Sequence, residues 1–158
     1  MSFAKTSDGI NLFYERVGSG TPIIFVHEFG GSHWSWEPQL NFFARRHQCL
    51  TFAARGYPPS DIPASIDAYS QGRAADDIID VLNAAGIDKA HVVGLSMGGF
   101  ASLHAALRHP KRVLSVVAAG AGYGAEKIHE DYFKGISAQV ADNFEKRGAK
   151  DLDRKSVV

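Results

Sequence analysis

One stretch constrains the fold of this chain more than any other: His91 to Phe100, which reads HVVGLSMGGF. A β-branched apolar run leads into G-x-S-x-G, and an alanine-rich helical pattern follows directly. This order predicts a nucleophile elbow, a sharp strained turn from strand to helix that exposes the hydroxyl of Ser96. Gly94 and Gly98 suit the crossing of strand and helix, because a side chain at either position would collide there.

The five-residue pattern alone also fits a solvated serine in a glycine-rich turn. The strand before it and the helix after it are the context that favours the elbow. The first turn of such a helix presents backbone N–H groups and the positive end of the helix dipole. Both would stabilise an oxyanion formed at Ser96.

Strand-like and helix-like patterns alternate along the rest of the chain. A turn at Ser7-Asp8-Gly9 joins two alternating runs, which predicts an N-terminal antiparallel hairpin. Apolar runs typical of buried strands are 23–27 and 48–54, and further apolar strand-like runs are 91–93 and 113–119. The helical patterns are 34–46, 69–85 and 97–109. The alternation predicts an α/β fold with a mostly parallel, doubly wound sheet.

Composition narrows the class of protein. The 17 basic and 17 acidic side chains balance, so charge favours neither nucleic acid nor an anionic membrane as a partner. The N-terminus lacks an apolar leader and no apolar run reaches membrane-spanning length. The single cysteine, Cys49, lies in an apolar run and is expected to be a buried, inert thiol. We expect a cytoplasmic protein without a cofactor.

Several motifs in this order give roughly residues 1–125 a resemblance to the N-terminal portion of an α/β-hydrolase-fold enzyme. His27 and the glycine-rich loop after it resemble the family's oxyanion loop after strand 3. Arg55-Gly56-Tyr57 and Ser60-Asp61 resemble the loop after strand 4. Ser96 resembles the nucleophile after strand 5.

The resemblance implies a serine hydrolase acting on a small-molecule acyl substrate, such as a carboxylic ester, a lactone or a carbon–carbon bond beside a ketone. Ser96 would attack the carbonyl carbon, and water would later hydrolyse the acyl-enzyme. The backbone N–H groups of Phe29 and Met97 would form the oxyanion hole. His27 would order its loop from behind, or would simply be a satisfied histidine at a strand end.

Two features near this loop carry further expectations. Glu28 stands where the family commonly has glycine, and a carboxylate facing the oxyanion hole would oppose negative charge. We therefore expect Glu28 to turn away from the hole or to pair with Arg55. Aromatic side chains could line an apolar pocket or could be packing residues: Phe29, Trp34, Trp36, Tyr57 and Phe100.

The family's catalytic acid follows strand 7 or strand 6 and its histidine follows strand 8, whereas about six of the eight strands are recognisable here. His104, His109 and His129 are poor candidates for the general base, because a triad requires specific geometry. We expect residues 1–122 to be the N-terminal part of the core and 123–158 the start of an incomplete helical cap.

On that expectation the chain is a fragment or is completed by another chain. A second polypeptide, a swapped copy or the rest of a longer chain would supply the last strands, the acid and the histidine. The 158-residue chain alone should then be nearly inactive.

Other functions stay open. The same fold could serve a haloperoxidase- or acyltransferase-type enzyme, or a non-catalytic binding scaffold, although the intact Ser96 disfavours the scaffold. An aspartate in its place would have indicated an epoxide hydrolase or a dehalogenase, and serine argues against both. Gly120 to Ala125 also fits the letters of a dinucleotide fingerprint, which requires a following strand and an acidic residue. Asp142 is near the required distance, but in a helical, polar context.

Overall fold

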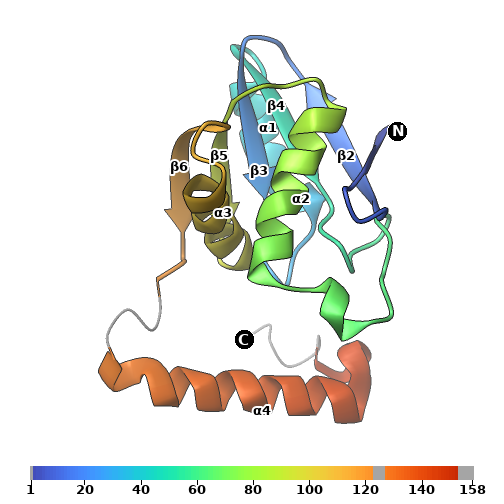
Figure 1. Cartoon of the computed structure of the whole chain (residues 1–158), viewed down its shortest axis with the longest axis vertical. Helices are drawn as coiled ribbons and strands as arrows, with labels where there is room; N and C mark the ends of the chain where they lie inside the picture. Colours follow the sequence, from blue (N-terminus) through green and yellow to red (C-terminus); the bar gives the residue numbers. More distant parts are fainter. Residues whose placement is uncertain (1, 123–126, 153–158) are drawn as a thin grey trace. The chain divides into compact units, whose positions relative to one another are not determined.

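The computed structural model of the protein describes residues 2–122 and 127–152 (Figure 1). The chain forms two compact units, Met1–Ala121 and Gly122–Val158. Within residues 2–122 the strands are β1 (Ser2–Lys5), β2 (Asn11–Val17), β3 (Thr21–Val26), β4 (His47–Phe52), β5 (Ala90–Leu95) and β6 (Val113–Ala119). The helices of this unit are η1 (His33–Trp36), α1 (Glu37–Phe43), η2 (Ile66–Ala68), α2 (Gln71–Ala84) and α3 (Met97–Arg108).

The strands form one sheet in the order β1-β2-β4-β3-β5-β6. β1 and β2 make an antiparallel hairpin, β2 pairs antiparallel with β4, and all the remaining neighbours are parallel. The predicted α/β fold, with a mostly parallel sheet and an N-terminal antiparallel hairpin, is therefore confirmed. Val26 is the register partner of both Phe52 and Gly94. The carboxyl ends of β3, β4 and β5 consequently lie at one edge, where the loops after them meet.

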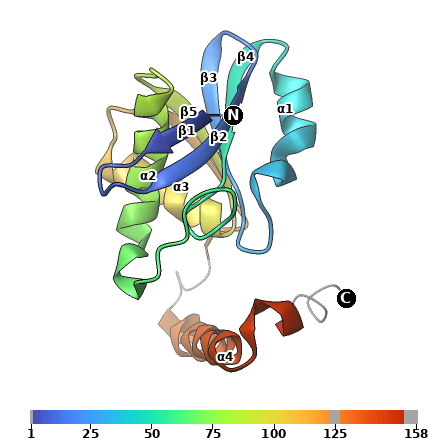
Figure 2. The ribbon, with the colours of Figure 1, turned by 90° about the vertical axis from the view of Figure 1, so that its right-hand side faces the viewer.

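Helices cover both faces of the sheet, α2 and α3 on one and α1 on the other (Figure 2). Successive residues of a strand point to opposite faces, so each strand supplies both cores. In β3, Ile24 and Val26 belong to the core that α2 and α3 cover, whereas Ile23 and Phe25 pack in the core beneath α1. Buried Cys49 belongs to the α1 core, and burial raises the pKa of its thiol, as expected for an inert cysteine.

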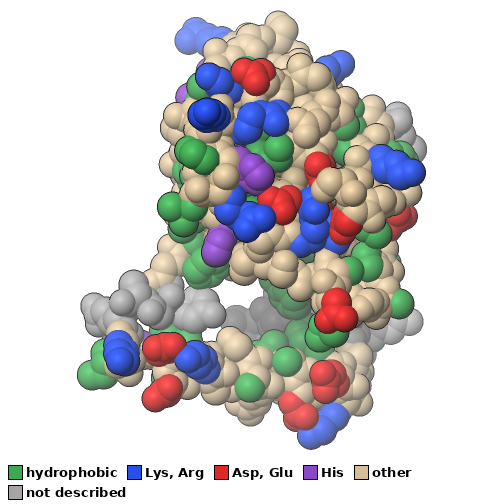
Figure 3. Space-filling view, in the orientation of Figure 1, with side chains coloured by type: hydrophobic (Ala, Val, Ile, Leu, Met, Phe, Trp, Pro, Cys, Tyr) green, Lys and Arg blue, Asp and Glu red, His purple; other side chains and the backbone are tan. Residues whose placement is uncertain are grey.

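The outer surface of α2 and α3 is charged: acidic, basic and histidine side chains gather over these helices (Figure 3). Apolar residues line the inner face of α2 at Ile78, Val81 and Leu82, all fully buried. This division between an apolar and a charged face is what a surface helix of a globular domain requires.

Two predicted helices differ in extent from the sequence pattern. The pattern over 34–46 divides into η1 and α1, with Pro38 in the first turn of α1, where a missing backbone N–H costs nothing. The next helix begins at Gln71 rather than at Tyr69, because the Ser70 hydroxyl accepts a hydrogen bond from Arg73 N at 3.0 Å and caps the helix.

The second unit contains α4 (Lys127–Leu152), whose helical backbone is interrupted at Gly148 with φ 69°. Ile128, Tyr132, Ile136 and Val140 are exposed on it at intervals of four residues. The assignment of residues 123–158 to a cap stays a prediction, and 123–126 and 153–158 lie outside the described residues. In the two described ranges, no helix is both long enough and apolar enough to cross a membrane.

Candidate active site

Ser96 lies in a strained turn between β5 and α3. Its φ is 51° and its ψ is −114°, and it is the one non-glycine residue with positive φ among the described residues. Its backbone N–H donates to the Ala119 carbonyl at 2.8 Å, and its carbonyl accepts from Phe100 N at 3.1 Å. Residues held in such a conformation concentrate at active sites, because the surrounding structure must enforce it. The predicted strand–turn–helix geometry is present at Ser96.

The glycines on either side of Ser96 let the first turn of α3 approach the sheet. A Cβ on Gly94 would overlap the Gly98 carbonyl, and a Cβ on Gly98 would overlap the Val26 carbonyl at the end of β3. The Ser102 hydroxyl donates to the same Gly98 carbonyl at 2.7 Å. The two glycines therefore bring the start of α3 directly against the ends of β5 and β3.

The loop after β3 begins at buried His27. Its Nε2 accepts a hydrogen bond from Ala54 N at 3.1 Å, so the ring proton is on Nδ1, which donates to the Glu28 carbonyl at 2.7 Å. Burial lowers the pKa of His27, which favours this neutral form. The imidazole thus connects the loop after β3 to the end of β4, and both ring nitrogens are occupied.

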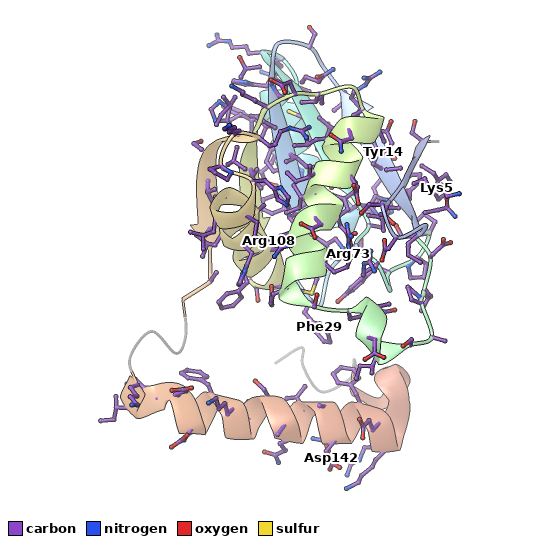
Figure 4. All side chains as sticks on the ribbon, viewed as in Figure 1. Lys5, Tyr14, Phe29, Arg73, Arg108 and Asp142 are labelled. Carbon is purple, nitrogen blue, oxygen red and sulfur yellow. The ribbon has the colours of Figure 1, made fainter. Side chains whose placement is uncertain are left out.

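A tight turn follows, in which Gly31 N donates to the Glu28 carbonyl at 3.3 Å. Phe29 is the second residue of this turn, and Figure 4 shows it at the end of the first unit toward which β3 runs. Its backbone N–H and that of Met97, the first residue of α3, are the two donors that the sequence assigns to the oxyanion hole. That assignment remains a prediction.

Glu28 does not pair with Arg55, so this part of the expectation is wrong. Its Oε1 accepts from the Ser35 hydroxyl at 2.9 Å, and its Oε2 is buried without a hydrogen-bond partner among the described residues. Arg55 is occupied elsewhere: its Nε and Nη2 donate to the two carboxylate oxygens of Asp77 on α2, each at 2.7 Å. A buried guanidinium requires such a bidentate partner, and Asp77 provides it.

Tyr57, in the loop after β4, joins the other two loops. Its hydroxyl donates to the Phe29 carbonyl at 2.8 Å and lies 3.8 Å from Met97 Sδ. Its ring packs edge-on against His27 with centroids 4.7 Å apart. Burial, with the Glu28 carboxylate nearby, raises the pKa of Tyr57 to about 12. The sequence placed Tyr57 in the loop after strand 4 and in a possible aromatic pocket, but it did not predict a contact between its hydroxyl and the loop after β3.

The tryptophans and Phe29 differ in how exposed their side chains are. Trp36 is 8% exposed and packs on Phe25 with ring centroids 5.1 Å apart, so it is a core residue. Trp34 and Phe29, by contrast, are 62% and 55% exposed.

None of the histidines named as candidate bases is brought to Ser96 within the first unit. His104 lies two turns along α3, about 12 Å away at 1.5 Å per residue. His109 follows the end of α3, about 20 Å away by the same measure, and its Nε2 contacts Asp76 at 2.6 Å. His129 lies on α4, in the second unit.

The dinucleotide fingerprint lacks its required context. Asp142 lies inside α4, not after a strand, and accepts a hydrogen bond from Lys146 at 2.8 Å (Figure 4). Tyr123 to Ala125 of the fingerprint lie outside the described residues. Elsewhere, the described part of the chain contains no cluster of three or more His, Cys, Asp or Glu side chains that could hold a metal ion.

Comparison with known proteins gives a consistent family. A family model described as alpha/beta hydrolase fold matches residues 21–157. A putative carbamate hydrolase, RutD of Azorhizobium caulinodans, is 39% identical over 119 residues, which is 73% of this chain and 43% of that protein. Epoxide hydrolase 1 of Caenorhabditis elegans is 35% identical over 106 residues, or 66% of this chain and 26% of that protein. This chain thus spans less than half the length of either relative.

Among solved structures, Est816, an N-acyl homoserine lactone degrading enzyme, matches with a TM-score of 0.69. It is 28% identical to this chain, and the match covers 92% of this chain and 61% of Est816.

Proposed function

The chain belongs to the α/β-hydrolase family, and on that basis we propose that it carries the nucleophile of a serine hydrolase acting on small acyl compounds. The strained backbone of Ser96, at the carboxyl end of β5 and the head of α3, is the observation that carries the proposal. A serine hydroxyl forms an acyl-enzyme with esters, lactones and related carbonyl compounds. The carbamate hydrolase and the lactone-degrading relative support an acyl substrate. Likeness to an epoxide hydrolase supports the fold, but a serine in the nucleophile position does not suit an epoxide.

In the proposed reaction, Ser96 Oγ attacks the carbonyl carbon and gives its proton to a general base. The tetrahedral oxyanion accepts hydrogen bonds from Phe29 N–H and Met97 N–H. The intermediate then collapses to an acyl-enzyme and releases the protonated leaving group. Water then attacks the acyl carbon and gives a proton to the base. The bond between the acyl carbon and Ser96 Oγ breaks, the carboxylic acid leaves, and the base returns the proton to Oγ.

His27 does not suit the role of that base. Its Nε2 already accepts from Ala54 N, and its Nδ1 proton is engaged with the Glu28 carbonyl. Taking a proton from Ser96 would break one of these bonds and charge a buried ring, which is costly. We therefore propose that the base and its acid come from outside residues 2–122, supplied by a further part of the same protein or by a second chain.

Fluorophosphonate labelling of the complete protein, including the segment or chain that supplies the base and the acid, followed by peptide mass spectrometry, tests the proposal. The adduct should lie on Ser96, and Ser96→Ala should abolish it. Ser115→Ala is a matched control, because the Ser115 hydroxyl lies 2.8 Å from His91 Nδ1 and so already has a histidine beside it. An adduct that persists in Ser96→Ala but disappears in Ser115→Ala would refute the proposal.

A further inference from the structure

We propose that the hydroxyl of Tyr57 is a positioning group for the oxyanion hole, fixing the loop after β3 relative to the first turn of α3. The inference rests on the function proposed above. Tyr57 does not contact substrate in this scheme; it acts through the backbone of Phe29 and through Met97.

The first reason is geometric. Tyr57 Oη contacts the two residues whose N–H groups are assigned to the hole, at 2.8 Å from the Phe29 carbonyl and 3.8 Å from Met97 Sδ. Phe29 lies in the loop after β3, whereas Met97 is the first residue of α3. Tyr57, in the loop after β4, therefore contacts both residues through one hydroxyl group.

The second reason is that the peptides on both sides of Phe29 are anchored by side chains. The Glu28 carbonyl accepts from His27 Nδ1, and the Phe29 carbonyl accepts from Tyr57 Oη. Because a peptide unit is planar, holding the Glu28 carbonyl also sets the direction of the Phe29 N–H. Holding the next peptide limits the remaining rotation about the Phe29 Cα. His27 and Tyr57 together thus restrict the aim of the N–H that would meet the oxyanion.

The third reason is that Tyr57 is itself held firmly. Its backbone N–H donates to the Ala54 carbonyl and its carbonyl accepts from Ser60 N, both at 3.0 Å. Its ring lies edge-on against buried His27. A carbonyl can only accept, so the tether requires a protonated hydroxyl, and a pKa raised to about 12 keeps it protonated over the usual working range.

The test compares Tyr57→Phe with Tyr69→Phe in the complete protein, including the segment or chain that supplies the base and the acid. Tyr69 is the matched control because its hydroxyl also donates to a loop carbonyl, that of Pro63 at 2.9 Å, instead of that of Phe29. Hydrogen exchange of the peptide covering residues 28–31 reports the loop directly, whatever the catalytic function. Phosphonylation of Ser96 by a fluorophosphonate, measured as kinact and KI, reports the oxyanion hole.

Tyr57→Phe should accelerate exchange in residues 28–31 and lower kinact about 10-fold to 100-fold, with KI changed less than about twofold. Loss of a whole oxyanion donor costs about 10²- to 10³-fold, and a loosened donor should cost less. The loss should appear in kinact and not in KI, because the hydrogen bond from Phe29 N–H strengthens only as the oxyanion forms. Tyr69→Phe should match the wild type in both measurements.

Unchanged exchange in Tyr57→Phe, or faster exchange with an unchanged kinact at Ser96, would overturn this inference and leave the proposed function intact. A reaction in which the wild-type adduct is not on Ser96 would overturn the proposed function, and the inference with it. The position of the adduct in the wild-type protein therefore distinguishes failure of this inference from failure of the proposed function.

Discussion

Replacing Asp77 by asparagine should destabilise the first unit by about 3 kcal/mol. Asp77 is 2% exposed, and its carboxylate accepts from Arg55 Nε and Nη2, each at 2.7 Å, and from Arg73 Nε at 3.1 Å. Burial raises the pKa of Asp77, against the pull of the two arginines. The ion pair itself therefore adds little net stability, but removing one partner leaves a buried guanidinium incompletely paired.

The magnitude follows from what Arg55 keeps. Breaking a buried ion pair from one side costs about 3–5 kcal/mol. Arg55 would retain its contacts with Asp8 at 2.9 Å and with the Ala68 carbonyl at 2.6 Å. Asparagine also keeps one acceptor oxygen at position 77. Both considerations favour the lower end of the range.

Urea unfolding followed by circular dichroism measures the loss as a shift of the midpoint at constant slope. Asp76→Asn is the matched control: it neutralises the neighbouring residue, whose partners are the surface groups Arg108 and His109. Exposed ion pairs contribute about 0–1 kcal/mol, so Asp76→Asn should lower the free energy of unfolding by less than about 1 kcal/mol. Equal losses in the two variants, or a loss below about 1 kcal/mol for Asp77→Asn, would refute the reasoning.

Two further predictions concern the site. Gly98→Ala should lower the free energy of unfolding in urea by about 1–3 kcal/mol, because the new Cβ would overlap the Val26 carbonyl. Gly72→Ala on α2 is the control and should be neutral or stabilising, because its Cβ would meet only the Arg108 side chain at 3.5 Å. A similar loss of stability in both variants would contradict this explanation. His27 has a lowered pKa in the folded state, so stability should fall as pH drops below the ordinary histidine value of 6.5. His27→Gln should reduce that slope by up to about 1.4 kcal/mol per pH unit, measured by urea unfolding between pH 7 and pH 5, and an unchanged slope would show that other groups cause it.

Elements encoded by contiguous residues were predictable from the sequence. Val113–Ala119 is an apolar run with the single polar residue Ser115 and forms β6 over the same residues. The strand leading to Ser96 and the helix after it were equally predictable, because periodicity and glycine spacing are local properties of the sequence. The helix over 34–46 was predicted too long, since its apolar spacing continues through a 3₁₀ turn that hydrophobic pattern alone does not distinguish from an α-helix.

Contacts between loops were not predictable in the same way. Glu28 was expected either to turn away from the oxyanion hole or to pair with Arg55, yet Arg55 pairs with Asp77, 22 residues further along the chain. The hydroxyl of Tyr57 reaches Phe29, 28 residues earlier, and Met97, 40 residues later. Charge and residue type name possible partners, but the choice among them depends on where the sheet brings each loop.

The elbow is encoded within one short stretch, because the strand, the glycines, Ser96 and the start of α3 are consecutive and their geometry follows from local backbone sterics. The surroundings of the elbow depend on the folded sheet. Parallel pairing in register brings the carboxyl ends of β3, β4 and β5 to one edge, and only there do His27, Tyr57 and Met97 converge. Pairing between strands far apart in the chain is a property of the whole sheet, so no short stretch of sequence encodes it.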